Sequence, residues 1–244
     1  MIDTPAGFAE AYVTCPDGAG PWPGVLFLVD AIGLRPRTEH MADLIASWGY
    51  VVLVPNLFYR DGTARDLAPK GPLQTATERT AFFKDAAPRI AALTADLATP
   101  DVVAYIQFLT SHPSVATGDV GITGYCMGGR LALLAAETWP DVVGAVGMFH
   151  TGGLVTDAPD SPHRNINRTR AEVLAIHADN DRSLPPQAVA DFEQALTKAG
   201  VKHSTSVYQG AEHGYTMSDT GMYHADACTH HFNQLRALLH RNLR

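Results

Sequence analysis

Apolar segments of strand length alternate with segments of helical periodicity along the whole chain. Because this alternation buries strands between layers of helices, it predicts an α/β fold with a mostly parallel central sheet and helices on both faces. The internal strand candidates are continuous runs of Val, Ile, Leu, Ala and Gly, as expected for strands that are covered on both faces. Seven strands are predicted, at Glu10–Cys15, Gly24–Val29, Tyr50–Val54, Val120–Gly124, Val142–Phe149, Val173–His177 and Ser204–Tyr208.

Helical periodicity predicts seven helices between and after these strands. They are expected near Pro36–Ser47, Thr77–Asp85, Pro88–Leu97, Val102–Ser111, Met127–Thr138, Pro186–Ala199 and Met222–Asn242. Two stretches, 57–74 and 151–168, have no strong period and are long for loops, so they are expected to form a rim or lid over a site. Since no internal repeat or linker is found, one domain over residues 1–244 is the simplest interpretation.

The charge balance argues for a small-molecule partner. Among 244 residues, 18 Lys and Arg stand against 25 Asp and Glu, which gives a net charge of −7. Without a basic cluster, neither nucleic acid nor an anionic membrane surface is an expected partner. No apolar run approaches the roughly 20 residues that a membrane-spanning helix needs. We expect a monomer or a weak homodimer.

The three cysteines, Cys15, Cys126 and Cys228, are an odd number without CxxC spacing. The N-terminal residues also lack the basic and apolar regions of a secretory signal. Both observations favour a reducing cytoplasm and argue against a disulfide framework.

Residues 120–130 read Val-Gly-Ile-Thr-Gly-Tyr-Cys-Met-Gly-Gly-Arg and join a predicted strand to a predicted helix. This is the context of a nucleophile elbow, G-x-S-x-G, with Cys126 in the place of serine. Gly124 and Gly128 would allow the close packing that lifts the nucleophile off the sheet, and the helix N-terminus would favour a thiolate. The alternative is that Cys126 is a small buried residue in an ordinary glycine turn.

An acid and a histidine follow in the order that this architecture uses. The strand at 173–177 leads into Ala-Asp-Asn-Asp-Arg-Ser-Leu-Pro, where Asp179 and Asp181 are both candidates. The D-x-x-x-P ending favours Asp181. His213 is the histidine of the loop after the last strand, whereas His150 could line the pocket or simply pack in the core.

These residue types predict nucleophilic catalysis. His213 would accept the proton of Cys126, Asp181 would hold the imidazole tautomer, and the thiolate would attack a carbonyl carbon to form an acyl-enzyme. The oxyanion would be stabilised by the backbone N–H of Met127 and by that of Ala31 in the turn after the strand 24–29.

Several segments resemble the dienelactone hydrolase family, a cysteine branch of the α/β-hydrolases, and the resemblance covers nearly the whole chain. The segments are Asp30-Ala-Ile-Gly, Tyr50-Val-Val-Leu-Val-Pro-Asn-Leu-Phe, Gly124-Tyr-Cys-Met-Gly-Gly, Asp181 with Pro185, and Gly210-Ala-Glu-His-Gly-Tyr. The resemblance implies a single-domain α/β-hydrolase that cleaves a lactone or carboxylic ester. It also implies that Cys126, Asp181 and His213 form the triad, without a metal or organic cofactor.

Two positions depart from the family's pattern. Asp30 stands where the family usually has a glutamate that pairs with the thiol, so the resemblance implies a thiol-modulating Asp30. The shorter side chain leaves a second interpretation, a turn residue that caps the region around Pro36. Met217 stands where the enzymes of dienelactone itself have a carboxylate-binding arginine, and Arg79 only lies near their second arginine. The natural substrate could therefore be another ester or lactone.

Other functional classes have weaker support. No G-x-x-x-x-G-K-[ST] or G-x-G-x-x-G motif predicts nucleotide binding. His224, Cys228 and His231 could share a helix face, but without a fourth ligand they are better explained as part of an ordinary terminal helix. The competing hypothesis is a non-catalytic α/β-hydrolase relative that binds a small molecule or senses oxidants through Cys126.

Overall fold

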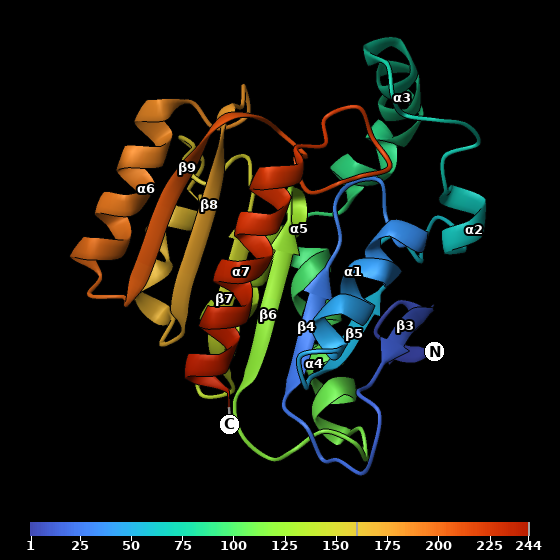
Figure 1. The fold of residues 1–244 in the computed structure, drawn as a ribbon, viewed down its shortest axis with the longest axis vertical. Coiled ribbons are helices and arrows are strands. Elements are labelled where there is room, and N and C mark those ends of the chain that lie inside the picture. The colour runs from blue at the N-terminus through green and yellow to red at the C-terminus, as the bar shows by residue number, and fades with distance from the viewer. Residues whose placement is uncertain (160, 244) are drawn as a thin grey trace.

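A seven-stranded sheet forms the centre of the computed structural model, which describes residues 1–159 and 161–243 (Figure 1). The strand order is β3-β5-β4-β6-β7-β8-β9, with β3 antiparallel to β5 and every other pair parallel. The strands are β3 (Ala11–Thr14), β4 (Gly24–Leu28), β5 (Val51–Pro55), β6 (Val120–Tyr125), β7 (Val143–Phe149), β8 (Glu172–Asn180) and β9 (His203–Glu212). The predicted α/β class and its mostly parallel sheet are therefore confirmed.

Helices cover both faces of this sheet. They are α1 (Pro36–Ala46), α2 (Ala64–Leu67), α3 (Ala76–Ala92), α4 (Ala95–Ser111), α5 (Met127–Thr138), α6 (Pro186–Lys198) and α7 (Ala225–Asn242), with 3-10 turns at Pro162–Arg164 and Ile166–Arg168. In Figure 1, α1 and α7 lie in front of the sheet, whereas α4 and α5 lie behind it. Every residue of β4 and β5 is buried between these layers, which explains their uninterrupted apolar sequences. No helix of the described residues is both long enough and apolar enough to span a membrane.

The predicted helix boundaries were wrong between residues 76 and 111. The sequence suggested three helices, two of them starting at or just after a proline, but Pro88 and Pro100 lie inside two longer helices, α3 and α4. The true start of α3 is a capping box in which the Thr75 side chain accepts from the backbone N–H of Glu78 while the Glu78 side chain accepts from that of Thr75. A proline lacks one N–H, but it need not end a helix, so each proline alone was a weak boundary signal.

The N-terminal residues form a hairpin that the sequence did not predict. Strand β1 (Ile2–Thr4) pairs antiparallel with β2 (Gly7–Ala9) in a separate two-stranded sheet. Strands of three residues are too short to show an alternating pattern, so periodicity could not find them.

The carboxyl edge of the parallel sheet carries the long connections. Helix α3 and the loop between β9 and α7 lie beyond this edge, at the top of Figure 1. The loop is joined to the segment before α3 by a bridge between Leu73 and Thr220. Open α/β sheets bind ligands at this edge, so the search for a functional site begins there.

Candidate active site

Cys126 occupies a strained turn between β6 and α5. Its backbone has φ +55° and ψ −119°, a region that residues other than glycine rarely adopt. Its N–H donates to the Phe149 carbonyl of β7 (3.1 Å), and its side chain is half-buried. Such strain persists where the surrounding structure enforces it, and it is typical of functional positions.

The glycines around Cys126 permit close backbone approach. A Cβ on Gly124 would lie 2.2 Å from the Gly128 carbonyl oxygen, and one on Gly128 would lie 2.2 Å from that of Leu28. A Cβ on Gly129 would collide with the Thr151 hydroxyl at 1.9 Å. The Gly-x-Cys-x-Gly-Gly pattern therefore allows the N-terminus of α5 to pack directly against β4 and β6.

Asp181 and His213 lie side by side because their strands pair. Asn180, the last residue of β8, is the register partner of Glu212, the last residue of β9. Asp181 and His213 are the residues that directly follow these two. His213 Nδ1 donates to Asp181 Oδ2 at 2.7 Å. The Asp181 side chain is only 2% exposed, whereas that of His213 is 29% exposed and can meet a substrate.

Ser183 completes this pair, and sequence reasoning missed it. Its hydroxyl and its N–H both donate to Asp181 Oδ1, at 2.6 and 2.8 Å, and its Oγ lies 3.2 Å from His213 Nδ1. Its carbonyl oxygen accepts from Gly153, so the segment after β7 also packs here. A hydroxyl residue two positions after a candidate acid, placed to close an Asx-type turn, was the available signal.

The charges of the site are strongly coupled. Burial disfavours the imidazolium form of His213, but negative charge on Cys126 and the hydrogen bond to Asp181 outweigh burial and raise the pKa of His213 to about 10. For Asp181, burial would raise the pKa, yet the bonds from His213 and Ser183 lower it below its ordinary value. The arrangement therefore favours the protonated form of His213 beside the ionised form of Asp181.

The second acid candidate, Asp179, has a different role. It is exposed, and its carboxylate accepts from the backbone N–H of Gly210 at 3.2 Å. Of the two acids, the structure brings Asp181 to His213 and leaves Asp179 bracing the end of β9.

Two backbone N–H groups without acceptors lie in the neighbouring turns after β4 and β6. Leu28 pairs with Gly124, so the turn after β4 lies beside the turn that carries Cys126. Within residues 1–159 and 161–243, the N–H groups of Ala31 and Met127 have no hydrogen-bond acceptor. Both are therefore free to donate to an oxyanion, the role that the sequence predicts for them.

Asp30 is engaged away from the thiol. Its Oδ1 accepts from the N–H groups of Ile32 (3.0 Å) and Gly33 (3.3 Å), and both oxygens accept from Arg35, at 2.7 and 3.0 Å. These are turn-capping and ion-pair contacts, and among the described residues none of its hydrogen bonds reaches Cys126. The thiol-modulating role of Asp30 remains a prediction.

His150 lies in the core beneath His213. It is fully buried, has φ +40°, and its Nε2 lies 2.8 Å from the Thr216 hydroxyl. Its ring packs edge-on against the His213 ring, with centroids 5.3 Å apart. Burial, followed by the proximity of His213, lowers its pKa well below the ordinary value, so it is neutral. Its full burial and its edge-on contact with the His213 ring favour a packing role.

The remaining sequence candidates lie outside the site. Met217 is buried, and Arg79 donates to the backbone carbonyls of Leu73 and Gln74 (3.3 and 2.7 Å). No group of three or more His, Cys, Asp or Glu suited to a metal occurs in the described part of the chain. His224, Cys228 and His231 instead cap or pack within α7.

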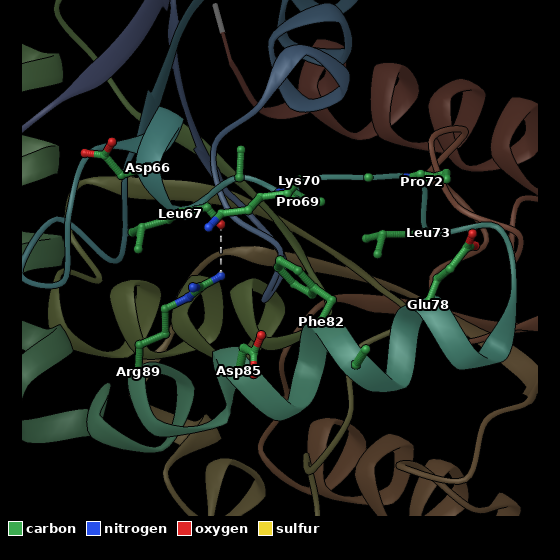
Figure 2. A pocket seen from close by; sticks show the side chains of 13 residues that line it. Asp66, Leu67, Pro69, Lys70, Pro72, Leu73, Glu78, Phe82, Asp85 and Arg89 are labelled. Atoms are coloured by element: carbon green, nitrogen blue, oxygen red, sulfur yellow. Dashed lines mark hydrogen bonds between the residues drawn. The ribbon is translucent and has the colours of Figure 1, made fainter.

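A cleft of about 430 Å³ separates residues 66–73 from α3 (Figure 2). Phe82 lines it, and Arg89 crosses it to donate to the Leu67 carbonyl at 3.3 Å. None of the three triad candidates lines this cleft. Its Leu73 carbonyl accepts from Gly221 of the loop after His213, so one wall of the cleft is bonded to that loop.

The fold is that of an α/β-hydrolase, with Cys126 on the turn between β6 and α5. The sequence profile described as "Dienelactone hydrolase family" matches residues 9–243, and this chain belongs to that family. It is a hydrolase family.

Individual relatives agree with this assignment. A Synechocystis protein provisionally named carboxymethylenebutenolidase is 27% identical over 238 residues, 96% of this chain and 92% of its own length. A Bradyrhizobium protein provisionally named 2-oxo-3-(5-oxofuran-2-ylidene)propanoate lactonase is 26% identical over 84% of this chain and 78% of its own. A Klebsiella pneumoniae crystal structure, provisionally a dienelactone hydrolase, has a TM-score of 0.81 at 22% identity and covers 95% of this chain and 92% of that one.

Proposed function

We propose that this protein hydrolyses a lactone or carboxylic ester through a thioester acyl-enzyme, with Cys126 as nucleophile, His213 as acid and base, and Asp181 as the residue that orients His213. The observation that carries the proposal is the 2.7 Å bond between Asp181 and His213 beside a cysteine on a strained strand–helix turn. Lactonase and carboxymethylenebutenolidase names among the relatives support the substrate class.

The geometry supports a two-step mechanism. The Cys126 thiolate attacks the carbonyl carbon, and the N–H groups of Ala31 and Met127 stabilise the oxyanion. Collapse of this intermediate breaks the C–O bond, and His213 gives its proton to the departing alkoxide. Water then loses a proton to His213 and attacks the thioester, which releases the carboxylic acid and regenerates Cys126. In a lactone, the alcohol stays attached to the acyl group.

The chemistry needs no metal or organic cofactor, because side chains and backbone groups supply every proton and charge. It does need a reduced thiol, which fits the cytoplasmic location that we propose. We also keep the proposals of one catalytic domain over residues 1–244, a monomer or weak homodimer, and no nucleic-acid partner.

A thiol-specific burst experiment tests the proposal. Wild-type protein mixed with p-nitrophenyl acetate should release a burst of nitrophenolate that matches the protein concentration, followed by steady turnover. Cys126→Ala should lose both phases, whereas Cys15→Ala and Cys228→Ala should keep them. If wild type shows no turnover with any short ester, lactone or thioester while Cys126 still oxidises reversibly, the redox-sensor alternative replaces the hydrolase.

A further inference from the structure

A buried ion-pair cluster joins two segments of the site that lie far apart in sequence. Arg35, directly before α1, contacts Asp30 in the turn after β4 and Asp219 in the loop after His213. Arg35 Nε lies 2.6 Å from Asp219, and a second nitrogen lies 3.3 Å from it. The side chains of Arg35 and Asp30 are 3% and 7% exposed, while Asp219 is 36% exposed.

Oδ1 of Asp30 has no remaining capacity to bind another donor, whereas Oδ2 is held by one nitrogen of Arg35. Its Oδ1 already accepts from Ile32, Gly33 and Arg35, and its Oδ2 accepts from a second nitrogen of Arg35. A carboxylate oxygen has about two lone-pair sites, so a thiol could bind Oδ1 only by displacing a donor. Arg35 also donates to the Gly33 carbonyl (2.9 Å), which fixes both ends of the turn that contains Ala31.

At its other end, the cluster holds the loop between β9 and α7, which contains both His213 and Asp219. Asp219 lies six residues after His213, and its carbonyl accepts from the Gln74 side chain at 3.2 Å. Arg37, two residues beyond Arg35, donates to the Thr216 carbonyl of the same loop. The start of α1 therefore anchors the loop at two points. Burial works against the charge of Arg35, but the two carboxylates outweigh it, and the pKa of Arg35 is raised.

We propose that Arg35 is a positioning residue that fixes the Ala31 N–H relative to His213 and holds Asp30 away from Cys126, so that the thiol pairs with His213 before any substrate binds. The oxyanion part of this inference rests on the proposed hydrolase function. The thiol part does not, because it concerns the free protein. Asp30 then acts on the turn through its contacts with Arg35 and the backbone, rather than on the thiol.

Two readouts test the two parts in a Cys15→Ala background, which removes the exposed thiol. The first is the rate of Cys126 alkylation by iodoacetamide between pH 5 and 9, without substrate. In Asp30→Asn this rate should match the background at every pH. A faster reaction in Asp30→Asn would mean that the carboxylate suppresses the thiolate, and it would overturn the proposal.

The second readout is steady-state ester hydrolysis. Arg35→Gln should lower kcat ten- to a hundredfold and leave KM within twofold, and Arg35→Lys should recover part of the loss. Asp219→Asn, which keeps the buried pair and so should fold, should lower kcat two- to fivefold. Wild-type kcat in Arg35→Gln, or in Asp219→Asn, would contradict the positioning role. If the background protein itself has no turnover, the hydrolase proposal fails, yet the alkylation comparison still decides where Asp30 acts.

Discussion

Strand β8 has a carboxylate at each end, and the two ends serve different purposes. Glu172 begins the strand at the amino edge of the sheet and accepts from Arg241 (2.7 Å), Lys202 (2.7 Å) and Asn242 (2.9 Å). Asp181 follows the last residue of the strand at the carboxyl edge and accepts from His213 and Ser183. Both carboxylates are nearly buried, and both have a lowered pKa.

The two carboxylates differ in the side chains that they bind: Glu172 binds a lysine and an arginine, whereas Asp181 binds a histidine. The bonds from Lys202 and Arg241 lower the pKa of Glu172, and they connect the residue before β9 and the end of α7 to the start of β8. In the proposed reaction His213 takes up and gives away a proton, so its bond to Asp181 affects proton transfer as well as structure. Similar acids on one strand therefore serve stability at one end and reactivity at the other.

Removal of His213, the partner of Asp181, should have the largest effect on activity. We expect His213→Ala to lower kcat by about 10⁴-fold or more, because the base and the proton donor of both steps are lost. Initial rates on the ester that wild type cleaves best provide the measurement. His203→Ala, at the opposite end of β9, is the matched control and should stay within twofold of wild type. Comparable losses in the two variants would refute the role of His213.

Removal of the acid should cost less than removal of the histidine. We expect Asp181→Asn to lower kcat about 10²- to 10⁴-fold, since the imidazole remains but loses its orientation. Because Asp181 helps to raise the pKa of His213, its loss lowers that pKa. The alkaline limb of the pH–rate profile should therefore move to lower pH. Asp179→Asn is the control, and full activity in Asp181→Asn would transfer the role of the acid to Asp179.

Ser183 should matter less than either triad partner. We expect Ser183→Ala to lower kcat roughly tenfold, because a hydrogen bond to a charged group contributes about 1.5 kcal/mol or more. The hydroxyl bond from Ser183 helps to lower the pKa of Asp181, so its loss raises that pKa and shifts the acid limb of the profile to higher pH, although the backbone N–H bond remains. The exposed neighbour Arg182→Ala should leave both kcat and the profile unchanged. An unshifted acid limb in Ser183→Ala would exclude the proposed effect on Asp181.

Sequence alone predicted the seven strands of the main sheet, mostly because the inner strands are local runs of apolar residues; β9 is largely polar and exposed, and only its segment 204–208 was predicted. It also singled out Cys126, Asp181 and His213, since each sits at a fixed distance from a strand end or a glycine turn; the structure brings Asp181 and His213 together, and their catalytic roles stay predictions. The predicted helix boundaries were wrong at Pro88 and Pro100, which lie inside α3 and α4. A proline alone does not show whether it begins a helix or lies within one. Helix boundaries depend on which face packs against the sheet, and the sequence does not state this.

The residues that support the site could not be predicted from the sequence, for a related reason. Arg35 meets Asp219 across 184 positions, and His150 meets Thr216 across 66. Neither pair leaves a spacing pattern, because a contact between distant segments is fixed only when the sheet forms. Asp30 shows the consequence: its place in the turn was predictable, whereas its partner Arg35 was not.

The amino end of β8 gives the smallest expected effect on activity and the clearest one on stability. Burial would raise the pKa of Glu172, but the bonds from Arg241, Lys202 and Asn242 lower it to about 2. A carboxylate with a lowered folded-state pKa adds stability above its unfolded pKa of roughly 4.5, and this contribution disappears as the pH falls toward 2.

We therefore expect Glu172→Gln to keep kcat within twofold and to lower the free energy of unfolding at pH 7 by about 1–2 kcal/mol, since Lys202 and Arg241 are partly exposed and screened. Urea titrations at pH 7, 4.5, 3 and 2 should show the gap between wild type and variant closing below pH 4.5. A gap that persists at pH 2 would mean that packing rather than charge accounts for the loss. A large fall in kcat would instead show that the two ends of β8 are coupled, because the variant leaves Asp181, His213 and Ser183 untouched.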